Sequence, residues 1–303
     1  MARIRGVPHA FPYQGSKRQL ASYIISCIPS NTKRLIEPFA GSAAITVAVA
    51  KLDLAKSFCI NDIHKPLIRL WYDIISNPKK LLAGYRKLWM EQAEQERAFY
   101  DKVRDHFNIT HDSASFLYLL ARCVKAAIRY NSKGEFNNSP DNRRKGMHPD
   151  LMESNLLFIS EILKGRTIVS CKDYREVLGN AVRNDVIYMD PPYQGVCGTH
   201  NHRYCQGIEF EEFVHALKQL NDRGISYILS YDGRLGQKEY GRPLPYELGL
   251  FKKEIVVGRS TQATLLGRDH NTVESLYLSS SLLNRLEKTP AILREQSQSF
   301  LFV

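Results

Sequence analysis

The stretch Val186-Ile187-Tyr188-Met189-Asp190-Pro191-Pro192-Tyr193 decides the fold of this chain. A short apolar run that ends at a polar residue and two prolines indicates a buried strand that stops at the prolines. In an open α/β sheet, ligands bind at the carboxyl ends of the strands, so we expect the last four residues to face a binding crevice. The alternative is an ordinary turn with a solvated Asp190, because Asp-Pro pairs often mark turns.

The four residues after this strand offer hydrogen-bond acceptors on a stiff backbone. Proline fixes φ and lacks an N–H, so the carbonyl groups of Pro191 and Pro192 are left to accept hydrogen bonds from an outside group. Asp190 adds a carboxylate, and Tyr193 adds a flat face on which a ring can stack. We therefore expect a cradle for a planar group that carries an amine.

Length, charge and cysteine content bound the class of protein. The 303 residues are enough for one large α/β domain or two smaller ones. A net charge of +11 favours a polyanionic partner such as nucleic acid, although a basic protein that only tolerates its charge is an alternative. The six scattered cysteines, together with the lack of a signal segment or a bilayer-length apolar run, predict reduced thiols in a cytoplasmic protein without a membrane anchor.

Two earlier segments place small or charged residues at turns. Phe11 to Lys17 contains a Gly-Ser turn into a helix whose amino end, with Lys17 nearby, would attract a carboxylate or phosphate. Arg34 to Ser42 predicts a strand ending at Glu37 and a turn at Gly41, where a ligand can approach the backbone closely. A dinucleotide fingerprint would need three glycines, so a nicotinamide cofactor is disfavoured.

Acidic residues follow two further predicted strands. Asp62 comes after Phe58 to Ile60, where an acid can accept hydrogen bonds from both hydroxyls of a ribose. The alternative for Asp62 is the N-cap of the following helix. Asp173 lies just beyond the predicted strand Thr167 to Ser170.

Between these strands, apolar residues recur at helical spacing from Pro78 to Tyr130, with Ser113 as an expected cap, which predicts an inserted helical subdomain. It leads into a polar loop, Arg129 to Asn137, and then into the basic run Arg143 to Lys145. Cations interleaved with aromatic rings suit nucleic acid, the cations for phosphates or guanine edges and the rings of Tyr130 and Phe136 for bases. A solvated basic loop is the competing interpretation.

The last part of the chain predicts three more strands, at residues 227–230, 255–257 and 275–278, the final two antiparallel at the sheet edge. A polar loop that starts at Arg259 is a second candidate for contact with nucleic acid. The segment 194–208 contains Cys197, His200, His202 and Cys205, but these four lack the long separation of a structural zinc site. We expect this segment to be a mobile lid and expect no metal.

Five of these segments, in this order, resemble the Dam-like (alpha-group) adenine-specific DNA methyltransferases: Phe11 to Lys17, Glu37 to Gly41, Asn61-Asp62, Arg129 to Asn137 and Asp190 to Tyr193. The resemblance extends from about residue 9 to about residue 280. It implies a Rossmann-like α/β sheet that uses S-adenosylmethionine, with an inserted helical DNA-recognition subdomain. Residues 1–75 and 151–283 would form the catalytic domain, 76–150 the recognition subdomain and 284–303 a tail.

The resemblance also implies roles for single residues. Tyr13, at a position that is Trp in Dam itself, and Lys17 would contact the cofactor. The segment of Glu37, Phe39 and Gly41 would pass under its methionine part. Asp62 would hold its ribose, and Asp173 would lie near its adenine. The expected DNA contacts are Arg129, Tyr130, Asn131, Lys133, Arg143, Arg144, Lys145 and Arg259.

The implied reaction is methyl transfer to the exocyclic amine of an adenine flipped out of duplex DNA. Tyr193 would stack on the base, while Asp190 and the Pro191 carbonyl accept the two amine hydrogens for direct in-line displacement. The chain would protect DNA against a companion restriction endonuclease. Two alternatives stay open: methylation of the exocyclic amine of cytosine, and a DNA-binding regulator without catalysis.

Overall fold

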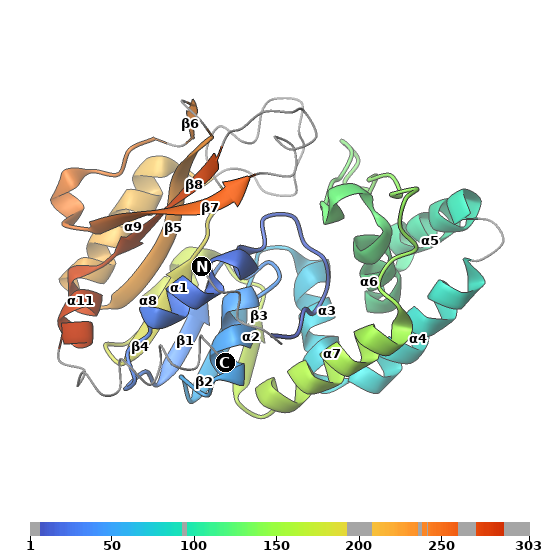
Figure 1. Ribbon diagram of the computed structural model, residues 1–303, viewed down its shortest axis with the longest axis horizontal. Coiled ribbons are helices and arrows are strands. Elements are labelled where there is room, and N and C mark those ends of the chain that lie inside the picture. Colours follow the sequence, from blue (N-terminus) through green and yellow to red (C-terminus); the bar gives the residue numbers. More distant parts are fainter. Residues whose placement is uncertain are drawn as a thin grey trace.

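The central feature of the fold is a mixed β-sheet (Figure 1). The structure is a computed structural model, and it describes residues 7–92, 96–192, 208–235, 238–240, 242–259 and 271–287. The strands are β1 (Arg34–Glu37), β2 (Ser57–Asn61), β3 (Thr167–Ser170), β4 (Asp185–Met189), β5 (Ser226–Leu235), β6 (Lys238–Tyr240), β7 (Phe251–Arg259) and β8 (Asn271–Leu278). Their order is β3-β2-β1-β4-β5-β8-β7, with β6 paired to β5. The strands from β3 to β5 are parallel, and β8 is antiparallel to both neighbours. The predicted α/β sheet and its antiparallel final strands are confirmed.

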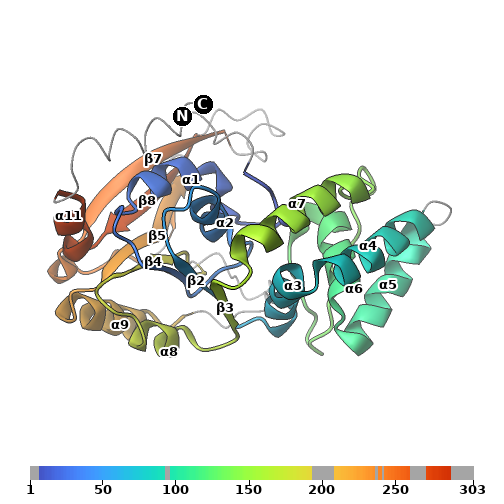
Figure 2. The ribbon, with the colours of Figure 1, turned by 90° about the horizontal axis from the view of Figure 1, so that it is seen from below.

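Side chains pack on both faces of the sheet at β4, which explains why this strand carries the continuous apolar run Val186 to Met189. Along β4, Val186 and Tyr188 join one buried cluster while Ile187 and Met189 join another. The first cluster includes residues of α1 (Ala21–Ser26), α2 (Ala44–Lys51) and α11 (Ser280–Glu287). The second cluster includes residues of α8 (Tyr174–Gly179) and α9 (Phe210–Asp222), on the opposite face (Figure 2).

A helical block lies beside the β3 edge of the sheet and is inserted between β2 and β3 (Figures 1 and 2). Its helices are α3 (Lys65–Ser76), α4 (Pro78–Glu91), α5 (Glu96–Thr110), α6 (Ser113–Arg122) and α7 (Pro149–Leu163). The block is attached to the sheet because α3 packs against β3 and α7 packs against α2. Short 3-10 turns occur at η1 (Lys17–Gln19), η2 (Val124–Ala126) and η3 (Tyr246–Leu248).

Two boundaries differ from the sequence-based expectation. The N-cap of α6 is Asp112, whose carboxylate accepts a hydrogen bond from the Ser115 N–H, so the expected cap at Ser113 was wrong by one residue. An acidic side chain satisfies the exposed N–H groups of a first turn at least as well as a hydroxyl does. At the other end, α11 extends past residue 283, where we expected the catalytic domain to end.

Some predictions fall outside the described residues. These are Tyr193, the segment 194–207 with its four cysteine and histidine residues, and the loop 260–270 after β7. The backbone of Arg259 ends β7, but its side chain is also outside the described part. Within the described residues, no helix is both long and apolar enough to cross a membrane.

Candidate active site

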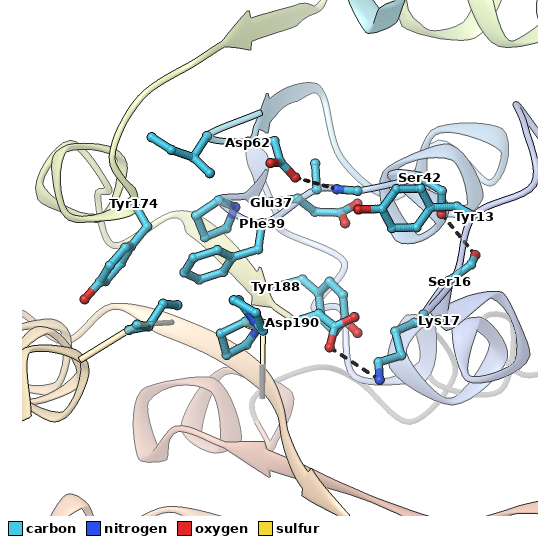
Figure 3. A pocket seen from close by; sticks show the side chains of 18 of the residues that line it. Tyr13, Ser16, Lys17, Glu37, Phe39, Ser42, Asp62, Tyr174, Tyr188 and Asp190 are labelled. Carbon is cyan, nitrogen blue, oxygen red and sulfur yellow. Dashed lines mark hydrogen bonds and ion pairs between the residues drawn. The ribbon is translucent and has the colours of Figure 1, made fainter. Parts of the chain in front are cut away.

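A cavity of about 1330 Å³ opens at the carboxyl ends of β1, β2 and β4, beside the turn that precedes α1 (Figure 3). This is the edge at which parallel strands gather their final residues. The lining includes every expected cofactor contact and two of the three expected catalytic residues: Tyr13, Lys17, Glu37, Phe39, Gly41, Asp62, Asp173, Asp190 and Pro191. The third expected catalytic residue, Tyr193, lies outside the described residues.

Gly41 lines the cavity, and both its N–H and its carbonyl are hydrogen-bonded. Its N–H donates to Asp62 Oδ2 at 3.1 Å, and its carbonyl accepts from Trp71 Nε1 at 2.9 Å. Its φ of +50° is in the left-handed region, and a Cβ there would lie 2.8 Å from the ring of Tyr13. Only glycine fits at this position, since any side chain would be strained and would displace Tyr13.

Asp62 is buried at the end of β2, where backbone N–H groups fix its carboxylate. In addition to Gly41, the His64 N–H donates to it at 3.1 Å. The N-cap of α3 is His64, whose Nδ1 accepts from the Leu67 N–H, so the cap role considered for Asp62 belongs to its neighbour. Burial raises the pKa of Asp62 to about 6, although these hydrogen bonds act to lower it.

Glu37, at the end of β1, is a second buried carboxyl group. It accepts a hydrogen bond from the N–H of Thr46 in the first turn of α2, a favourable place for an acidic group. Burial raises the pKa of Glu37 to about 8; hydrogen bonds from Thr46 lower it, and the nearby Asp190 raises it further. Glu37 and Asp190 thus bring two acidic groups to one wall.

Lys17 supplies the positive charge next to Asp190. Its Nζ lies 3.4 Å from Asp190 Oδ1 and 2.9 Å from Glu274 Oε2 of β8. The ion pair between Lys17 and Asp190 is visible in Figure 3. The sequence predicted that this turn would attract a carboxylate or a phosphate. In the structure, Lys17 contacts two carboxylates of the protein itself, Asp190 and Glu274.

The opposite wall of the cavity is aromatic and charged. The rings of Phe39 and Tyr174 have centroids 5.2 Å apart. Asp173 caps α8 by accepting from the Arg175 N–H, and it also forms an ion pair with the Arg175 guanidinium at 2.8 Å. Arg175 in turn pairs with Glu212 of α9 at 2.8 Å, so this wall is braced between two helices.

The loop 129–137 is folded onto the helical block. The Oδ1 atom of Asn131 accepts from the N–H groups of Lys133 and Glu135, and its Nδ2 donates to the Glu135 carboxylate. The ring of Phe136 is fully buried against Phe107, so the expectation that it stacks on a base was wrong. An apolar ring next to a helical core gains more from burial than from exposure.

Tyr130, which was also expected to face bases, is partly buried. Its hydroxyl lies 2.7 Å from His64 Nε2. Because His64 Nδ1 accepts from Leu67, Nε2 carries the proton and donates to Tyr130. Burial lowers the pKa of His64 to about 3, which keeps the ring neutral.

Arg143, Arg144 and Lys145 are exposed on a turn that buried side chains hold from behind. Gln92 Nε2 donates to the Lys145 carbonyl at 3.0 Å, and Arg122 Nη1 donates to the Asp141 carbonyl at 3.1 Å. Farther along, the Tyr85 hydroxyl donates to the Met147 carbonyl at 2.6 Å. The basic turn is therefore held in place by the helices, while its side chains are accessible to a polyanion.

Several cavity residues were not anticipated, chiefly Tyr174, Arg175, Tyr188 and Glu274. Tyr188 lies within the β4 strand itself, and its inward direction follows from the alternation along that strand. Glu274 had no local signal, since its place depends on the pairing of β8 with β5. Among the described residues, no group of three or more His, Cys, Asp or Glu side chains is arranged to hold a metal ion.

Comparison with known proteins agrees with this geometry. The model of the D12 class N6 adenine-specific DNA methyltransferases matches residues 13–289. The type II methyltransferase M.MjaIII of Methanocaldococcus jannaschii is 30% identical over 241 residues, which is 72% of this chain and 82% of that protein. The retron Ec67 DNA adenine methylase of Escherichia coli is 29% identical over 225 residues, 72% of this chain and 75% of that protein.

A DNA adenine methylase of Vibrio cholerae is 28% identical over 228 residues, 72% of this chain and 79% of that protein. These matches confirm the resemblance to the Dam-like enzymes. They favour adenine over cytosine as the target and an enzyme over a regulator without catalysis. The chain belongs to the D12 class of N6 adenine-specific DNA methyltransferases.

Proposed function

We propose that the cavity binds S-adenosylmethionine and that Asp190 directs its methyl group to the exocyclic amine of an adenine extruded from duplex DNA. The observation that carries the proposal is the shared cavity, in which Asp190 lies with Gly41, Asp62 and Lys17. A strand-ending turn with a solvated aspartate would not bring these groups together.

The residues present fit this cofactor. Gly41 lines the cavity, and its missing Cβ leaves room for the Tyr13 ring, which lines the same cavity. The Asp62 carboxylate can accept from ribose hydroxyls, and the rings of Phe39 and Tyr174 offer flat surfaces for an adenine. When bound, the cofactor supplies a methyl group on a positively charged sulfur. The carboxyl groups of Glu37 and Asp190 suit a cavity that holds a cation.

Asp190 and the Pro191 carbonyl would act on the substrate amine. Each would accept one hydrogen bond from the amine, which turns the nitrogen lone pair toward the methyl group. The nitrogen–methyl bond would form as the sulfur–methyl bond breaks, and the amine would lose one proton along its hydrogen bond to the Asp190 carboxylate. The base must leave the duplex to reach this depth, which costs a few kcal/mol. Tyr193, the next residue but one after Pro191, is proposed to stack on the extruded ring.

Residues 76–150, the part of the helical block that we expected to form the recognition subdomain, are proposed to hold the duplex. Its exposed basic turn Arg143 to Lys145 is fixed from behind, which reduces the loss of freedom on binding phosphates. The loop with Arg129 and Lys133 is the proposed route to base edges. Asn131 contributes by folding this loop, since both ends of its amide are bonded within it.

We also propose that the chain is the modification partner of a restriction endonuclease. Two of the relatives are named type II methyltransferases, M.MjaIII and M1.LlaDCHI of Lactococcus lactis. The test is digestion of DNA from cells that express the chain. This DNA should resist an endonuclease that cuts the same recognition sequence when it is unmethylated. If the DNA is methylated but every such endonuclease still cleaves it, the protective role is contradicted and the methylation serves a role outside restriction.

Base extrusion has its own test. Sequencing of DNA from expressing cells, with detection of modified bases, identifies the target site. A duplex with 2-aminopurine in place of the target adenine should then gain fluorescence on binding, because the unstacked base is no longer quenched. A duplex with 2-aminopurine one position away is the control. Equal signals from both duplexes would contradict extrusion of the target.

A further inference from the structure

Lys17 lies between two carboxylates from distant parts of the chain. Asp190 ends β4, whereas Glu274 lies on β8, the strand inserted between β5 and β7. The Lys17 side chain is only 9% exposed, and the two acidic side chains are 20% and 21% exposed. Charges this sheltered from water interact more strongly than surface ion pairs do.

The position of Glu274 follows from the way β5 is bent. Pairing between β5 and β8 shifts register between Ser230 and Gly233, and Asp232 within the bulge has a φ of +54°. Such bulges redirect side chains near functional sites. Glu274 points to the same face as Leu276, which packs in the cluster with α1, and it reaches the cavity there.

The two distances from Lys17 differ in a way that matters. The 2.9 Å contact with Glu274 is a hydrogen bond, whereas 3.4 Å to Asp190 is longer than a charge-assisted hydrogen bond of about 2.7–2.9 Å. Lys17 is thus drawn toward Glu274. Its ammonium stabilises the charge of Asp190 from a longer distance than that of its hydrogen bond to Glu274.

We propose that Glu274 is a positioning residue for methyl transfer, one that holds the Lys17 ammonium away from Asp190. This inference rests on the proposed role of Asp190. Removal of Glu274 would let the ammonium settle on Asp190 and compete with the substrate amine. Removal of Lys17 would take away the ammonium that contacts both carboxylates. Removal of both would restore the original charge balance next to Asp190.

The test compares Glu274→Gln, Lys17→Met and the double variant in steady-state methyl transfer from S-adenosylmethionine to duplex DNA. Each single change should lower kcat by about tenfold to a hundredfold, the range seen when partners behind a functional group are removed. KM for DNA should stay within about twofold, because the contact acts on Asp190 and not on DNA binding. The double variant should have a higher kcat than either single variant.

Glu254→Gln on the neighbouring strand β7 is the control, since this exposed residue makes the same change of charge outside the cavity. Its kcat should match that of the unaltered chain. If Glu274→Gln fails to fold, the comparison of the double variant with Lys17→Met still tests the inference, because the double variant should have the higher kcat. Two results would overturn the inference. One is a fold-loss of kcat in the double variant that equals or exceeds the product of the two single fold-losses. The other is a normal kcat in Glu274→Gln.

The role of Asp190 is tested separately by Asp190→Ala. Normal turnover by that variant would remove the proposed function itself. Loss of turnover in Asp190→Ala, together with multiplicative losses in the Lys17 and Glu274 series, would remove only the positioning role of Glu274.

Discussion

The cavity at the strand ends and the basic turn of the helical block handle charge in opposite ways. In the cavity, backbone N–H groups bind the buried carboxyl groups of Glu37 and Asp62, and Lys17 forms an ion pair with the partly buried Asp190. On the block, Arg143 to Lys145 are exposed, and it is their backbone that buried side chains hold. One region is preorganised for a small ligand and for chemistry, the other for a long polyanion. Changes in the first should alter turnover, and changes in the second should alter DNA affinity.

The largest effect is expected from Asp190→Ala. Loss of the acceptor at the end of β4 should lower kcat by about a thousandfold, as expected when a preorganised polar group at a reacting centre is removed. The DNA dissociation constant, measured by fluorescence anisotropy, should stay within about twofold. A large loss of DNA affinity would instead place Asp190 in the binding surface and break the division between the two regions.

Gly41→Ala should have the next largest effect, on cofactor affinity. The new Cβ would lie 2.8 Å from the Tyr13 ring, so this ring, which lines the cavity, must shift. We expect the dissociation constant for S-adenosylmethionine, measured by calorimetry, to rise at least about tenfold. Gly165→Ala is the matched control, because Gly165 also has positive φ but nothing lies within 4 Å of its added Cβ.

Both glycine substitutions should lower the free energy of unfolding by about 1–2 kcal/mol, from backbone strain alone. Only Gly41→Ala should weaken cofactor binding. Equal cofactor affinity in the two variants would mean that the ligand does not approach Gly41.

Replacement of Arg143, Arg144 and Lys145 by alanine should act on the other region. DNA affinity should fall, and the slope of log affinity against log salt should become shallower by about 0.9 for each phosphate that the protein no longer neutralises. At saturating DNA, kcat should be unchanged. Lys56→Ala is the control, because this exposed lysine directly precedes β2 and so lies at the amino ends of the parallel strands, away from the cavity. An unchanged salt slope in the triple variant would contradict the proposed surface.

The smallest effect is a pH dependence that belongs to the cavity. Burial raises the pKa of Asp62 to about 6, so the native state binds this proton more readily than the unfolded chain does. Stability contributed by the protonated group is therefore lost as pH rises through about 6. Cofactor affinity has the opposite trend, since ribose hydroxyls need the ionised acceptor: it should rise between about pH 5 and about pH 7. The Asp62→Asn variant should show no such rise.

The sequence predicted the sheet well because buried parallel strands are continuous apolar runs, as at Val186 to Met189. The same reasoning brought Glu37, Asp62 and Asp190 to one cavity, because the carboxyl ends of parallel strands share an edge. These inferences need only local patterns and one rule of topology.

Other features depend on contacts between distant segments, which a local pattern does not encode. Glu274 contacts Lys17, more than 250 residues earlier in the chain, from a strand that pairs with β5 next to a bulge. Phe136 was expected to face bases, but the Asn108 amide of α5 forms hydrogen bonds with the N–H and the carbonyl of Phe136. The Phe136 ring is buried. No local pattern predicted that Gln92 and Arg122 hold the basic turn. The carbonyls that they bind, of Lys145 and Asp141, lie much later in the chain.

The most direct test of the account is a crystal structure of the chain with S-adenosylhomocysteine and a duplex that contains the target adenine. We expect the adenine to lie outside the helix, with its amine within hydrogen-bond distance of Asp190 and the Pro191 carbonyl. We also expect the ribose of the cofactor product to lie on Asp62 and phosphates to contact Arg143 to Lys145. An adenine that stays stacked in the duplex, or a cofactor product bound away from Gly41 and Asp62, would contradict it.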